Sequence, residues 1–122
     1  MRVLVGIEGS EESSTVLRNA IERALEADDE LTVAVFAKPE RGQDIEEIEL
    51  TVRKELDTAG IEAAIHRLEG DPASELVAMA EREEFDQLVI GGGRDTPLGK
   101  RYLGGISEYV LLNADVTVRL ER

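Results

Sequence analysis

The amino-acid sequence predicts an α/β fold: a single domain over residues 1–122, with an open, doubly wound, five-stranded parallel sheet of strand order 3-2-1-4-5 and helices on both faces. Short apolar runs alternate along the chain with longer segments of helical periodicity. The runs Val3–Ile7 and Leu31–Ala37 show almost no polar alternation, which is typical of parallel strands covered on both faces. A length of 122 residues is enough for one modest core.

The first strand, Val3–Ile7, leads into the start of a helix. Ser10 is a suitable N-cap because its hydroxyl can accept a hydrogen bond from a free backbone N–H. Apolar residues then recur at helical spacing as far as Leu25. Asp28 and Asp29 follow, and because carboxylates are unfavourable at a helix C-terminus, we expect a turn there.

Local sequence signals also mark where the second strand and the second helix end. After Leu31–Ala37, proline and glycine mark Lys38–Gln43 as a connection. The apolar stripe of the next helix runs from Ile45 to Ala59, and Gly60 follows where a left-handed C-cap is expected.

The third strand is less apolar than the first two. Ile61–Leu68 interleaves apolar and charged residues, a partly exposed pattern that indicates a strand near the sheet edge. Asp71 then provides an N-cap and Pro72 a first helical residue, which together predict a helix that runs to about Glu83.

The C-terminal part of the chain carries most of the glycines. A buried strand at Leu88–Ile90 enters the loop Gly91–Tyr102, a fourth helix begins near Ile106 and stops near Asn113, and Val116–Leu120 alternates as a last strand. Glycines let a backbone approach a ligand closely, and the free N–H groups of a helix N-terminus favour phosphate. This layout predicts an anion site.

The composition narrows the classes of partner. A formal net charge of −13, from 27 acidic against 14 basic residues, argues against a nucleic-acid partner. No stretch has the apolar length of a transmembrane helix, so we expect no membrane partner. The chain has no cysteine, which excludes disulfides and thiolate metal sites. We therefore expect a cytoplasmic protein. The many acidic residues favour the high-salt cytoplasm of a halophile, with an ordinary acidic domain as the alternative.

Three loops should meet at one edge of the predicted sheet. In a doubly wound sheet, the loops that follow strands one, two and four form one crevice at the strand C-termini. These loops begin after Ile7, near Phe36 and after Ile90. An adenosine could lie across the first two strands, with its phosphates on the backbone around Gly104–Ile106.

Nearly the whole chain resembles the universal stress protein family. The matching stretches are the opening Val-Leu-Val-Gly-Ile-Glu-Gly-Ser (3–10), the Gly-Asp-Pro-Ala at 70–73, and residues 91–120. The nucleotide-binding signature of that family is a glycine, two residues, a second glycine, nine residues, then Gly-Ser or Gly-Thr. Here the first glycine is Gly91, the second falls on Arg94, and the closing pair is Gly104-Gly105.

The resemblance implies a regulatory, Rossmann-like domain for stress response that binds ATP, AMP or a related adenine nucleotide, with Mg²⁺ as an optional companion. Efficient catalysis is not expected, although slow ATP hydrolysis stays open. Arg94 could clamp a phosphate through its guanidinium or fill the space that the ligand needs, and Gly105 lacks a hydroxyl donor. The candidate binding residues are Ile7, Glu8, Phe36, Ile90, Gly91, Gly93, Arg94, Gly104, Gly105 and Ile106.

Several of these residues also fit plain structural roles. Glu8, where the family usually has Asp, either accepts hydrogen bonds near the base or ribose, or caps the first helix, or faces solvent. Phe36 fits a core position better than an adenine contact. The glycines at 91–93 form either a tight turn or a close approach to ligand. His66 and the acidic clusters indicate neither a catalytic base nor a metal site.

The resemblance also implies a homodimer through the last strand, where Val116, Val118 and Leu120 form one apolar face of an unpaired edge. If Arg94 and Gly105 have broken the site, the alternative is a dimeric stress or interaction protein that binds no nucleotide. A phosphoacceptor receiver domain has a similar sheet, but this chain lacks the paired acids and the aspartate that such a domain needs.

Overall fold

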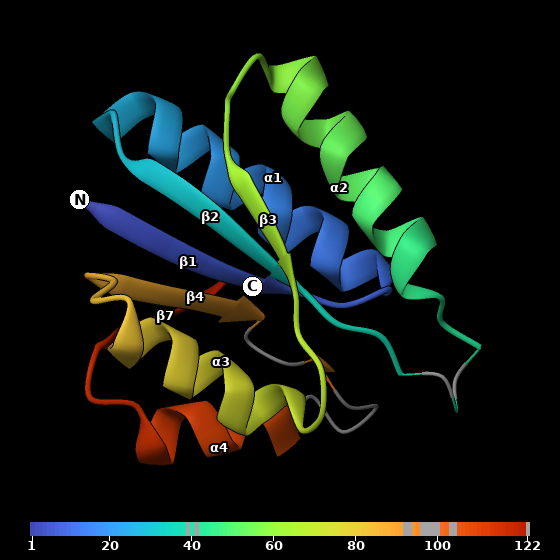
Figure 1. The fold of residues 1–122 in the computed structure, drawn as a ribbon, viewed down its shortest axis with the longest axis vertical. Coiled ribbons are helices and arrows are strands. Elements are labelled where there is room, and N and C mark those ends of the chain that lie inside the picture. Colours follow the sequence, from blue (N-terminus) through green and yellow to red (C-terminus); the bar gives the residue numbers. More distant parts are fainter. Residues whose placement is uncertain (39, 41, 92–93, 96–100, 103–104, 122) are drawn as a thin grey trace.

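Figure 1 shows the computed structural model, which describes residues 1–38, 40, 42–91, 94–95, 101–102 and 105–121. Its main strands are β1 (Arg2–Ile7), β2 (Glu30–Val35), β3 (Ala64–Arg67), β4 (Gln87–Gly91) and β7 (Thr117–Glu121). They form one parallel sheet in the order β3-β2-β1-β4-β7. The α/β class and the strand order predicted from the sequence are thereby confirmed.

Each face of the sheet is covered by one pair of helices. These are α1 (Glu11–Ala27) and α2 (Ile45–Ala59) on one face, and α3 (Pro72–Arg82) and α4 (Gly105–Asn113) on the other (Figure 1). Val5 and Val33 belong to the apolar cluster of the α1–α2 face, whereas Leu4 and Leu88 belong to the cluster of the α3–α4 face. Successive side chains of a strand point to opposite faces, so strands covered on both sides must be apolar throughout. Among the described residues, no helix is both long enough and apolar enough to cross a membrane.

The helix ends follow the local signals in the sequence. Ser10 caps α1, because its hydroxyl accepts a hydrogen bond from the Ser13 N–H at 3.3 Å. Gly60 ends α2 in the left-handed region with φ of 70°. Asp28 ends α1 in the same region with φ of 56°, a conformation that aspartate tolerates better than most residues.

Two strands have ends that lie two or three residues from the predicted ones, and one short ribbon was not predicted. β2 stops at Val35 rather than Ala37, and β3 begins at Ala64 rather than Ile61, because β3 pairs only with residues 32–35 of β2. Within the stretch expected to be a loop, β5 (Arg94–Asp95) and β6 (Arg101–Tyr102) form a short antiparallel ribbon. Strands of two residues are too short to leave a periodic signal in the sequence.

The last strand, β7, exposes a backbone edge and not the apolar side-chain face that was expected. Val116, Val118 and Leu120 are partly buried and pack against the α3–α4 cluster, so their face is covered within the chain. The interpretation of these three side chains as an uncovered apolar face is therefore wrong. β7 lies at the end of the sheet and pairs with β4 alone among the described strands, so its open feature is a backbone edge.

Candidate functional site

The carboxyl ends of β1, β2 and β4 lie at one edge of the sheet, where the chain changes helix layer. Ile7 of β1 is in register with Val35 of β2, and Val5 of β1 is in register with Val89 of β4. From β1 the chain enters α1 on one face, whereas α4, which follows β4 in the chain, lies on the other face (Figure 1). Connections that diverge in this way form the crevice where open α/β sheets bind ligands.

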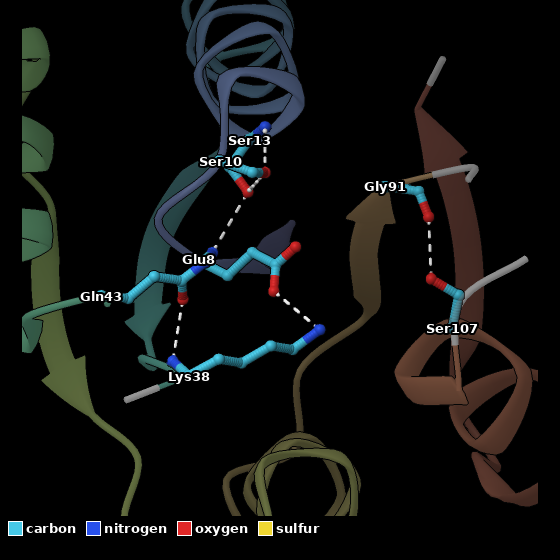
Figure 2. Close-up of polar contacts among 7 residues, drawn as sticks. All are labelled: Glu8, Ser10, Ser13, Lys38, Gln43, Gly91 and Ser107. Carbon is cyan, nitrogen blue, oxygen red and sulfur yellow. Dashed lines mark hydrogen bonds and ion pairs between the residues drawn. The ribbon is translucent and has the colours of Figure 1, made fainter. Parts of the chain in front are cut away.

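Two serines and a glycine shape the turn between β1 and α1. The backbone N–H of Glu8 donates to Ser13 Oγ at 3.2 Å, and the Ser10 and Ser13 hydroxyls are hydrogen bonded at 3.1 Å (Figure 2). A Cβ added at Gly9 would lie 3.0 Å from Ile48 Cδ1 of α2. Glycine therefore lets α2 pack closely against the turn, and the serines fix the backbone of Glu8.

The Glu8 side chain pairs with Lys38 across the ends of β1 and β2 (Figure 2). Lys38 Nζ lies 3.1 Å from Glu8 Oε2, and the two side chains are 25% and 24% exposed. The contact is an ion pair without hydrogen-bond geometry, because Oε2 is a buried atom with no hydrogen-bond partner in the described part of the chain. The prediction that Glu8 caps the first helix is wrong, since Ser10 does so.

Lys38 is held by its backbone as well as by its charge. Its N–H donates to Gln43 Oε1 at 2.8 Å (Figure 2), and its carbonyl accepts from the Gln43 N–H at 3.4 Å. These two hydrogen bonds join the two ends of the connection between β2 and α2. The position of Lys38 at the edge of the sheet therefore does not depend on Glu8 alone.

At the other half of the edge, a serine joins α4 to β4. Ser107 Oγ donates to the Gly91 carbonyl at 2.9 Å, which draws the first turn of α4 to the end of the strand (Figure 2). A Cβ added at Gly105, the first residue of α4, would meet no atom of the described residues within 4 Å. The first turn of a helix carries N–H groups without intrahelical partners, and these favour an anion.

A hollow of about 420 Å³ lies beside the β1–α1 turn, between the first halves of α1 and α2. Its lining combines apolar side chains with hydroxyls and carboxylates. Neither Phe36 nor Gly91 nor Gly105 lines it, so it is distinct from the edge between β1 and β4. The lining residues are Ile7, Glu8, Gly9, Ser10, Ser13, Ser14, Leu17, Gly42, Gln43, Asp44, Glu47, Ile48, Thr51 and Val52.

Four candidate residues from the sequence belong to the packed part of the edge. Ile7, Phe36 and Ile90 are at most 6% exposed, so they underlie the crevice. Phe36 continues the β1–β2 pairing, since its N–H donates to the Ile7 carbonyl at 3.1 Å. Ile106 is partly buried and packs against the α3–α4 cluster.

The glycine motif is described only in part. Gly91 ends β4 and Gly105 begins α4. The backbone of Arg94 belongs to β5, but its side chain lies outside what the structure describes, as do Gly93 and Gly104 altogether. The contribution of these three residues stays a prediction.

Sequence reasoning missed Lys38, Ser13 and Ser107. One weak signal was present for each: Lys38 directly follows a strand that ends at the crevice, Ser13 stands three residues after an N-cap, and Ser107 follows the glycine pair. Asp44, which belongs to one of the acidic clusters, caps α2 by accepting from the Glu46 N–H at 3.0 Å. Within the described residues, no group of three or more histidine or acidic side chains could hold a metal ion.

Two curated proteins match segments of this chain. A universal stress protein from Methanothermobacter thermautotrophicus is 44% identical over 54 residues, which is 44% of this chain and 36% of that protein. A second, from Methanocaldococcus jannaschii, is 36% identical over 67 residues, which is 55% of this chain and 39% of that protein. The matched segments thus span well under half of these relatives.

Solved structures match the fold over almost the whole chain. A universal stress protein from Archaeoglobus fulgidus has a TM-score of 0.80 at 24% identity, covering 97% of this chain and 96% of that one. A universal stress protein in complex with cAMP has a TM-score of 0.78 at 23% identity, covering 100% and 96%. An Arabidopsis thaliana family member with AMP bound has a TM-score of 0.72 at 17% identity, covering 98% and 90%.

The family itself is shown by the sequence as a whole. Residues 1–120 match the family model described as the universal stress protein family. The match includes the opening strand, the glycine-rich stretch and the last strand as far as residue 120. This chain belongs to the universal stress protein family.

Proposed function

We propose that this protein binds an adenine nucleotide at the carboxyl edge of its sheet, and that binding serves regulation in a stress response. The observation that carries the proposal is the junction of β4 and α4. Ser107 draws the start of α4 to Gly91, and Gly105 leaves the first helical residue without a side chain. Relatives with the same fold have been crystallised with cAMP and AMP, which supports an adenine nucleotide as the ligand here.

In our proposal, the phosphates lie at the start of α4 and the adenosine lies across the ends of β1 and β2. The first turn of α4 supplies backbone N–H donors to the phosphates. Glu8 supplies a carboxylate acceptor toward the base or ribose. Gly93, Arg94 and Gly104 complete the phosphate loop in this proposal, with Arg94 as a guanidinium clamp.

We propose regulation rather than turnover because the described part of the edge offers no free base near the proposed phosphate position. Of the described carboxylates at this edge, Glu8 is engaged with Lys38 at 3.1 Å, and Glu121, which is in register with Gly91, lies 2.9 Å from Arg119. A hydrolase would need a group that orients the attacking water. Binding is therefore the stronger proposal, with any ATP hydrolysis slow.

A second candidate function is that of a dimeric interaction protein without nucleotide. It is favoured by apolar side chains on α4, where Tyr109, Leu111 and Leu112 are 38%, 41% and 77% exposed. α4 leads into β7, whose backbone edge is open among the described strands. A second copy of the chain is the occupant we propose, because two such edges can pair about a two-fold axis.

Thermal unfolding with ATP and AMP, with and without Mg²⁺ and at high salt, tests the first proposal. The wild type is compared with a variant that restores the family motif, Arg94→Gly with Gly105→Ser. Stabilisation of the wild type at sub-millimolar nucleotide is the expected result, because a ligand that binds only the folded state raises the melting temperature. Stabilisation of the restored variant alone would move the conclusion to the interaction protein, with sedimentation measuring its dimer.

A further inference from the structure

The Glu8–Lys38 ion pair places two opposite charges at the edge where we propose that an anionic ligand binds. Their charged atoms lie 3.1 Å apart, and each side chain is about three-quarters buried. Figure 2 shows the Lys38 side chain reaching from the end of β2 to the Glu8 carboxylate. Because water reaches both groups only in part, each charge is screened less than an exposed charge.

Without Lys38, this edge would present an uncompensated carboxylate to the ligand. The whole chain carries a net charge of −13, and Asp44 and Glu47 line the neighbouring hollow. An approaching phosphate would therefore meet repulsion from Glu8 added to a negative background. The positive charge of Lys38 offsets the repulsion that comes from Glu8.

We propose that Lys38 is a specificity-determining residue, which neutralises Glu8 and so allows the crevice to accept a phosphorylated adenine ligand rather than the uncharged nucleoside alone. The inference rests on the proposed function, since it concerns the same ligand. In this role Lys38 sets the net charge of the crevice and does not itself contact a phosphate.

The charged side chains of this pair can be changed without removing the hydrogen bonds that hold their backbones. Lys38 is held through its backbone by Gln43, and Glu8 is held through its backbone by Ser13. Substituting either charged side chain leaves these hydrogen bonds in place. Variants of the pair should therefore keep the fold while changing the charge at the edge.

The experiment measures dissociation constants of adenosine, AMP and ATP by calorimetry for four variants. Lys38→Met leaves Glu8 uncompensated, Glu8→Gln leaves Lys38 uncompensated, and the double variant removes both charges. Lys54→Met is the matched control, because it removes the same charge from an exposed position on α2. Thermal unfolding of each variant without ligand checks that the fold is intact.

We expect Lys38→Met to weaken AMP binding by about threefold to tenfold relative to adenosine, with a larger loss for ATP, because the uncompensated Glu8 carboxylate repels the added phosphate charge. Glu8→Gln should strengthen AMP binding relative to adenosine. The double variant should return to within about twofold of the wild-type ratio, and Lys54→Met should change that ratio by less than about twofold.

The two proposals fail in different ways. If Lys38→Met weakens adenosine and AMP equally, or changes neither, nucleotide binding stands and the role of Lys38 is overturned. An equal effect of Lys54→Met would also overturn it, because general net charge would then account for the result. If the wild type and all variants bind none of the three ligands, the proposed function fails, and the role of Lys38 fails with it.

Discussion

The two halves of the carboxyl edge are built by different means. At the β1–α1 turn, side-chain contacts hold the backbone beside the hollow: Ser13 accepts from the Glu8 N–H, and Ile48 lies close to Gly9. At the β4–α4 junction, one hydrogen bond from Ser107 to Gly91 brings two elements together around open backbone. The first half is thus held by several side-chain contacts, whereas the second leaves its backbone accessible in the part that the structure describes.

The comparison shows that glycine serves two opposite purposes in this edge. A Cβ at Gly9 would lie within 3.0–3.3 Å of side-chain atoms of Ile48 and Gln43, so this glycine is needed for close packing. Among the residues that the structure describes, a Cβ at Gly105 would meet no atom within 4 Å, so that glycine leaves room beside a helix N-terminus. A glycine in the sequence therefore does not by itself reveal which purpose it serves.

The largest effect is expected for Gly9→Ala. The added methyl group must displace Ile48 or shift α2, and overpacking of this kind costs about 1–3 kcal/mol of unfolding free energy. Urea unfolding of the variant and the wild type measures the loss. Gly105→Ala is the matched control, for which we expect no loss, since the site is open and alanine favours a helix.

A double-mutant cycle sharpens this prediction. Ile48→Ala opens space in front of Gly9, so the extra cost of Gly9→Ala should be smaller in that background than in the wild type. Equal costs in the two backgrounds would mean that the loss arises from backbone conformation and not from the contact with Ile48.

The next effect compares the serine of each half. Ser13→Ala leaves the partly buried Glu8 N–H without its acceptor, which should cost about 1–2 kcal/mol. Ser107→Ala removes a donor from the Gly91 carbonyl and should cost about 0.5–1.5 kcal/mol. Hydrogen exchange should show faster opening at the β1–α1 turn in the first variant and at the start of α4 in the second. Faster exchange at both places in either variant would contradict the view that the two halves are held independently.

Local signals in the sequence were enough to predict most of the fold. The unalternating runs that became β1 and β2 identify strands covered on both faces, and Ser10 and Gly60 mark helix ends through their own chemistry. The β5–β6 ribbon was missed because two-residue strands carry no periodicity.

The site was predictable only as a location. Strand ends and glycines indicate the correct edge, but the Glu8–Lys38 pair joins residues 30 positions apart. Their meeting depends on the register of β1 with β2, in which Ile7 faces Val35, and on the Gln43 contact that anchors Lys38. Neither the register nor that contact is encoded in a short motif.

The smallest effect concerns a second ion pair, at the β3 edge. Glu49 Oε1 accepts from Arg67 Nε at 2.8 Å and Glu49 Oε2 accepts from Arg53 Nη2 at 3.4 Å, and these arginines hold the pKa of the Glu49 carboxyl below its ordinary value. A lowered carboxyl pKa means that the stabilisation is present at neutral pH and is lost as the pH falls through the folded-state pKa. Because both arginines are largely exposed, the contribution to the unfolding free energy should be small.

Carboxyl NMR titration of Glu49 measures this effect directly. Arg67→Met should raise the Glu49 pKa toward its ordinary value by more than Arg53→Met does, because the hydrogen bond from Arg67 is the largest cause of the lowered value. High salt should shrink the difference, since water and ions reach this surface pair. In the Glu8–Lys38 pair both side chains are about three-quarters buried, so we expect that pair to be less sensitive to salt. If salt weakens both ion pairs equally, then partial burial does not protect the Glu8–Lys38 pair from screening. The two halves of the edge would then differ only in their steric contacts.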